Sequence, residues 1–221
     1  MSGVTDLLRQ LKELNSVVGK DGQLMSEAKA GKKECQRKLA DLQREMQGLS
    51  GELASLEGQY RSVANEVSKG EKQAKIRQAG IRMQIDSKRG LLMQKQQEAG
   101  QKREQISKYV NIIRQLRTNL NLQSSTIENL KSEFEEMKGS YQLSTNAFTS
   151  LLYTKYAGAA AATGASVTSD KVDKCEKGAE YCNSLQEKIN ILLSSTDSSD
   201  DDVPDPSPSK NNPDREEERY L

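Results

Sequence analysis

The residues that most often carry out catalysis are scarce in this chain, which contains no histidine. Histidine is the commonest general base and metal ligand, and without it every Ser-His and Cys-His nucleophilic pairing is excluded. The glycine-rich phosphate-binding patterns G-x-x-x-x-G-K-[ST] and G-x-G-x-x-G are also absent. Neighbouring acids such as Glu135 and Glu136 fall on a charged helix face where the pattern implies no pocket. We therefore expect no enzymatic activity, no cofactor, no metal and no small-molecule substrate.

Three cysteines are the next candidates for chemistry. Cys175 and Cys182 lie seven residues apart on one predicted helix, which separates their α-carbons by about 10 Å, too far for a disulfide within that helix. A bridge to a second chain or a metal site is the alternative, but neither has supporting ligands nearby. We expect both, like Cys35, to be small buried residues in a helix seam. An odd, sparse count is typical of a reducing compartment and predicts an intracellular protein, cytoplasmic or part of a larger assembly.

A basic segment is the last candidate. Between Lys69 and Arg103 the chain has ten Lys or Arg and three acids. Such a segment could bind the phosphates of nucleic acid or an anionic lipid surface, although it lacks the aromatic residues that stack on single-stranded bases. The alternatives are a solvated helix face and a contact with the acidic C-terminal segment of the same or another copy. The candidate anion-binding residues are Arg82, Lys88, Arg89, Lys95, Lys102 and Arg103.

The elements that position these residues are predicted by a seven-residue apolar repeat. Steps of seven from Ile85 to Phe148 meet ten apolar residues in succession, in a chain that is 34% apolar. A second repeat runs from Met25 to Ile81, with a slip of four residues between Val67 and Ile85. Such columns stay on one line only when helices supercoil around each other, so the repeat predicts a coiled coil. The predicted oligomer seam consists of Leu39, Leu42, Leu49, Leu53, Leu56, Ile106, Ile113, Leu116, Leu120, Ile127 and Leu130.

Composition predicts an all-α chain. Trp is absent, Phe occurs twice and 29% of residues are charged, so apolar material suffices for a stripe but not for a globular core. The first proline is Pro204, which is typical of long helices. The predicted parts are an N-terminal helix at 1–22 that is either kinked at its end or continuous with the next part, a long coiled coil at 23–152 with a weak basic middle at 68–105, an Ala/Gly/Ser-rich link at 153–168, a C-terminal helix at 169–193 and a disordered acidic tail at 194–221.

Two arrangements of the long helix fit the repeat. One is an extended parallel homo-oligomer in which residues 4–152 form a rod of about 220 Å. The other is an antiparallel hairpin with arms at 24–68 and 106–152 and a turn near Asp86–Gly90. Ile81, Ile85 and Leu92 keep helical phase straight through that turn. We therefore favour the extended rod, with the hairpin as the second arrangement.

These features favour a structural role. The N-terminus lacks the apolar stretch of a signal peptide, and no segment approaches the roughly 20 apolar residues of a bilayer span. We expect a soluble coiled-coil protein that self-associates, as a homodimer or larger oligomer, and acts as a scaffold, spacer or tether for protein partners. The alternative is a helical hairpin that binds anionic membrane or nucleic acid through the basic middle.

Overall fold

A computed structural model of the chain describes residues 3–70, 72–155 and 161–195. These residues form three α-helices, α1 (Val4–Ser68), α2 (Lys72–Lys155) and α3 (Ala161–Ser194), and no strand occurs among them. The prediction of an all-α chain is confirmed. None of the three helices, over the residues so described, is both long enough and apolar enough to span a bilayer.

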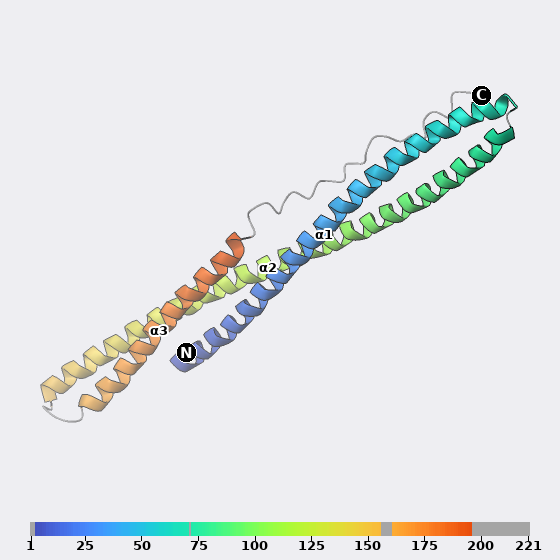
Figure 1. Cartoon of the computed structure of the whole chain (residues 1–221). Helices are drawn as coiled ribbons and strands as arrows, with labels where there is room; N and C mark the ends of the chain where they lie inside the picture. Colours follow the sequence, from blue (N-terminus) through green and yellow to red (C-terminus); the bar gives the residue numbers. More distant parts are fainter. Residues whose placement is uncertain (1–2, 71, 156–160, 196–221) are drawn as a thin grey trace, which may run out of the picture.

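The helices α1 and α2 lie side by side and antiparallel (Figure 1). Gly70 has a φ of +88°, which a glycine adopts without steric cost, and its N–H donates to the carbonyl of Val67 at the end of α1. The chain therefore reverses between Ser68 and Lys72, not near Asp86–Gly90. The single chain forms the hairpin, the second of the two arrangements, and not the favoured extended rod, because α1 ends where the rod needs a continuous helix.

The position of the turn explains the four-residue slip in the repeat. Ala74 and Ile81 continue the column of Val67 by steps of seven, so the sequence suggests one unbroken helix. In the structure Ala74 is buried and Ile81 half-buried. Both belong to a second column of α2, a set of residues at steps of seven that is offset by three residues from the set containing Ile85. The phase is thus preserved across a turn that separates two helices.

The third helix covers one end of the hairpin. It is antiparallel to α2, as the ion pair between Lys138 and Glu176 and the contact between Phe134 and Gly178 indicate, and it also touches α1. Its start at Ala161 is earlier than the predicted start at residue 169, and α1 continues without interruption through Gly19 and Gly22. Residues 196–221, most of the predicted disordered tail, lie outside the described residues.

The three helices enclose one apolar core at this end. We call residues 4–29, 116–155 and 161–195 the head, where α3 packs against α2 and, over part of its length, against α1, and residues 30–115 the arm, where α1 and α2 form a two-helix hairpin. The core of the head draws on all three helices: Val4, Leu7, Leu11, Val18, Met25, Leu116, Leu120, Ile127, Leu130, Phe134, Cys175, Ala179, Cys182, Leu185 and Ile189.

The predicted seam residues are covered within this single chain. Nine of the eleven are buried, and Leu39 and Leu56 are half-buried. The seam therefore does not need a second chain to remove its apolar side chains from water. The buried nine are Leu42, Leu49, Leu53, Ile106, Ile113, Leu116, Leu120, Ile127 and Leu130.

One close contact between α2 and α3 depends on a glycine. Gly178 lies against the ring of Phe134, which is fully buried. A Cβ at position 178 would lie 2.5 Å from Cε1 of Phe134, closer than van der Waals contact allows. Because the ring is enclosed on all sides, it cannot move away without opening the core of the head.

The contact predicts the effect of one methyl group. We expect Gly178→Ala to lower the free energy of unfolding by about 1–3 kcal/mol, the usual cost of overpacking a core. The matched control is Gly90→Ala, at a helical position where no described side chain lies within 4 Å of the added Cβ. The control should raise stability by about 0.5–1 kcal/mol through helix propensity. Urea denaturation followed by circular dichroism measures both, and equal effects of the two substitutions would contradict the packing.

Candidate interaction surfaces

The basic segment lies on α2 of the arm and faces acidic residues of α1. In this antiparallel register a step of seven residues along α2 corresponds to a step of seven back along α1, so successive lysines meet successive glutamates. The amino group of Lys95 lies 2.9 Å from Glu45. Seven residues earlier on α2, Lys88 pairs with Glu52, which is seven residues further along α1. Cross-hairpin ion pairs among the described residues include Lys95–Glu45, Lys88–Glu52, Arg89–Glu57 and Arg77–Glu66.

Three of the six candidate anion-binding residues are engaged in this way, namely Lys88, Arg89 and Lys95. The hydrogen bond to Glu45 raises the pKa of Lys95, which keeps its amino group charged. Lys102 donates to the side-chain oxygen of Gln105 at 3.0 Å. The segment is thus not simply a solvated face, because the ion pairs join it to α1.

The other two candidates, Arg82 and Arg103, are exposed and have no ion pair within the described ranges. Arg82 lines a shallow pocket of about 370 Å³ between α1 and α2, together with Tyr60, Arg61 and Arg89. The acids Glu57 and Asp86 line the same pocket. The mixture of charges leaves the pocket only slightly positive, so the pocket alone is a weak anion site.

The arm as a whole carries a larger positive charge than the basic segment suggests. Residues 30–115 contain 18 Lys or Arg and 10 Asp or Glu, a net charge of +8, whereas the head has 12 and 13, a net charge of −1. Part of the excess comes from α1, where Lys32, Lys33, Arg37 and Lys38 lie close together in sequence. Sequence reasoning missed this contribution because only the hairpin places these residues beside the basic part of α2.

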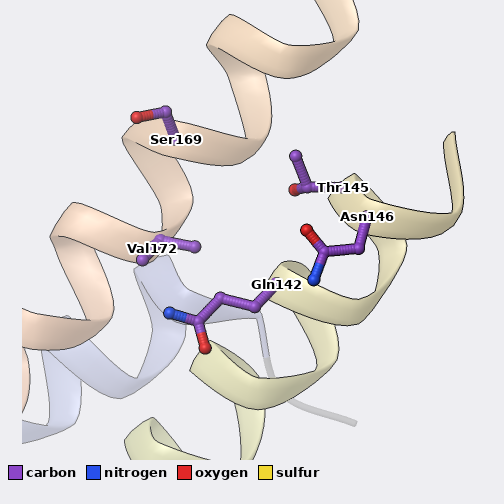
Figure 2. Close-up of a pocket in the computed structure, with 5 residues that line it drawn as sticks. All are labelled: Gln142, Thr145, Asn146, Ser169 and Val172. Atoms are coloured by element: carbon purple, nitrogen blue, oxygen red, sulfur yellow. The ribbon is translucent and has the colours of Figure 1, made fainter. Parts of the chain in front are cut away.

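A second pocket lies between α2 and α3 in the head, again about 370 Å³ in volume. Figure 2 shows Gln142, Thr145 and Asn146 on α2 facing Ser169 and Val172 on α3. Amides and hydroxyls can form hydrogen bonds, but no side chain in the lining titrates near neutral pH. The pocket therefore offers no acid or base for catalysis, and nothing in the sequence marked these residues as a group.

The cysteines are buried and free, as expected of small residues in helix seams. Cys175 and Cys182 lie in the core of the head, whereas the thiol of Cys35 in the arm donates to Gln105 at 3.5 Å. Burial raises the pKa of the Cys175 thiol and raises that of Cys182 to about 11. Both thiols of the head are therefore protonated and poorly nucleophilic near neutral pH. Across the described part of the chain, no group of three or more Cys, Asp or Glu side chains could hold a metal ion.

The raised pKa of Cys182 predicts a loss of stability in alkaline solution. The unfolded thiol ionises near its ordinary value of 9.0, whereas the folded thiol stays protonated to about 11. The unfolded state then binds fewer protons, so the free energy of unfolding falls as pH rises through this interval. We expect the fall to be smaller in Cys182→Ala than in the native chain, because lysines and tyrosines titrate alike in both. Urea denaturation at several pH values measures the fall in the free energy of unfolding of each chain. Parallel pH profiles of the native chain and Cys182→Ala would exclude the buried thiol as a cause.

Comparison with protein-family models, with curated proteins and with solved structures finds no match for this chain. The surfaces of the chain therefore provide the evidence on function. They are a positively charged two-helix arm, a polar pocket in the head and a number of exposed apolar side chains along α2.

Proposed function

We propose that this chain is a non-enzymatic structural protein, a scaffold, spacer or tether that holds protein partners at the two ends of a long helical body. The observation that carries the proposal is the placement of exposed apolar side chains on α2. This helix has 84 residues and spans about 126 Å at 1.5 Å per residue. Large apolar groups are exposed near both of its ends.

The first group lies beside the hairpin turn. Ile76 and Met83 are 77% and 74% exposed, and their spacing of seven residues places them on one face of α2. The second group, Leu143, Phe148 and Leu151, lies on the last turns of the same helix. Clustered apolar side chains in contact with water often mark protein-docking surfaces. Sixty residues separate Met83 from Leu143, so the two groups stand about 90 Å apart.

Self-association remains a prediction that requires a surface other than the seam. The seam residues that motivated a homo-oligomer are covered inside one chain. The two end groups are available to a second copy or to different proteins. A tether needs only that each end binds its own partner, and this reading fits two apolar groups joined by one rigid helix.

Charged substitutions at the ends test the tether. We expect Ile76→Lys with Met83→Lys to abolish the binding of one set of partners, and Leu143→Lys with Leu151→Lys to abolish the binding of another. The circular dichroism spectrum of both variants should stay that of the native chain. The matched control is Leu122→Lys, an equally apolar residue, 64% exposed, between the two groups. Crosslinking of each tagged chain in cells, followed by mass spectrometry, measures the partners.

The outcome is decisive in either direction. Loss of two different sets of proteins, with both sets retained by the Leu122 control, supports a tether with two docking ends. Retention of every partner by both double variants would overturn the proposal. Loss of one and the same set from both would instead indicate a single extended interface.

The charge of the arm supports a second candidate function, the binding of anionic membrane or nucleic acid. Its net charge of +8 includes exposed bases with no acidic partner among the described residues, such as Lys75, Arg82 and Arg103. Replacing these three with Gln should weaken binding to duplex DNA or to anionic vesicles at low salt. If they contact phosphates, the slope of log affinity against log salt should fall in magnitude by roughly two to three. Absence of binding by the native chain at low salt would dismiss this candidate.

A further inference from the structure

The acidic C-terminal segment has a net charge opposite in sign to that of the arm. Residues 196–221 contain 9 Asp or Glu and 3 Lys or Arg, a net charge of −6. The arm carries +8, whereas the head carries −1. Electrostatic attraction within the chain therefore favours the arm over the head as the surface for this segment.

The point at which the segment leaves the helices lies where the arm begins. The amino group of Lys29 donates to the backbone oxygen of Ser195 at 3.2 Å and to its hydroxyl at 3.0 Å. Leu192 also lies against Gly22, so the last turn of α3 packs beside α1. Ser195 thus lies at the boundary where the third helix ends and the two-helix arm continues, and residues 196–221 follow it in the chain.

The length of the segment suffices to cover the arm. At about 3.4 Å per residue its 26 residues span at most about 90 Å. The 39 residues of α1 in the arm, 30–68, extend about 58 Å at 1.5 Å per residue. Every base of the arm is therefore within reach of the segment without any change in the helices.

The bases that would receive the segment are exposed bases of the arm that form no ion pair with the residues described. The cross-hairpin ion pairs already neutralise part of α2, as do pairs within one helix such as Lys108–Glu104. The exposed bases that have no ion pair with another described residue occur on both helices. They include Lys33, Arg61, Lys72, Lys75, Arg82 and Arg103.

We propose that residues 196–221 lie along the arm of their own chain and are held there by charge. The covalent connection of the segment to α3 favours the arm of the same copy over that of a second copy, because it gives the segment an effective concentration of order millimolar at the arm. The segment then covers the basic surface and competes with any external polyanion for it. This inference is independent of the tether function, which concerns the apolar ends of α2.

Carbodiimide crosslinking of the full-length chain tests the proposal, because it joins carboxylates to lysines that are in contact. Acids at the far end of the segment, Asp214 and Glu216–Glu218, should couple several-fold more often to Lys72 and Lys75 than to Lys12. The comparison is demanding because Lys12, in the head, is about 26 Å along α1 from Lys29, whereas the tip of the arm is about 58 Å away. The preference should disappear at high salt, which screens charges beyond a few ångströms.

Two further measurements test whether the contact is within one copy and depends on charge. In a mixture of isotope-labelled and unlabelled chains, the crosslinks should join residues of one copy. Arg61→Gln with Arg82→Gln should reduce crosslinking to Lys72 and Lys75 although both lysines remain, because the surface loses charge. Equal coupling to Lys12 and to the arm, coupling mainly between copies, or coupling unaffected by salt would each overturn the proposal.

Discussion

Burial of one narrow apolar stripe is the constraint on which this structure depends. Most apolar residues of each long helix lie on one face, and such a helix is stable in water only when another helix covers that face. Here the covering helix comes from the same chain, because Gly70 allows the backbone to reverse between α1 and α2. Each large side chain removed from water, such as Ile113 or Leu49, contributes about 1.5–3 kcal/mol before the cost in conformational entropy.

The elements and the seam could be predicted from the sequence, but the turn could not. Steps of seven identify Ile106, Ile113 and Leu120 without knowledge of the fold, because a buried stripe must repeat. The turn was hidden because Val67, Ala74 and Ile81 keep one phase while they pass from a column of α1 to a different column of α2. The start of α3 was missed for another reason, since the Ala- and Gly-rich stretch before residue 166 has no apolar periodicity.

The candidate surfaces were predictable only in part. The number of lysines and arginines marked the basic segment, since charge can be counted without a structure. Their partners could not be named, because the pairing of Lys95 with Glu45 depends on the antiparallel register, which the position of the turn alone determines. A turn at Asp86–Gly90 would have placed Lys88 in a loop and removed its pairing with Glu52.

The residues along one column of α2 show how the sequence encodes the division between arm and head. After Ala74 and Ile81 beside the turn, the column continues in the arm with Lys88, Lys95, Lys102 and Tyr109, and in the head with Leu116, Gln123, Leu130 and Met137. The change occurs where α3 begins to cover α2. A lysine beside a two-helix seam can extend its amino group to water or to a glutamate of α1. A third helix over the arm would bury these amino groups, which costs several kcal/mol for each charge left without a partner. The three lysines therefore favour a two-helix arm with a charged, accessible surface.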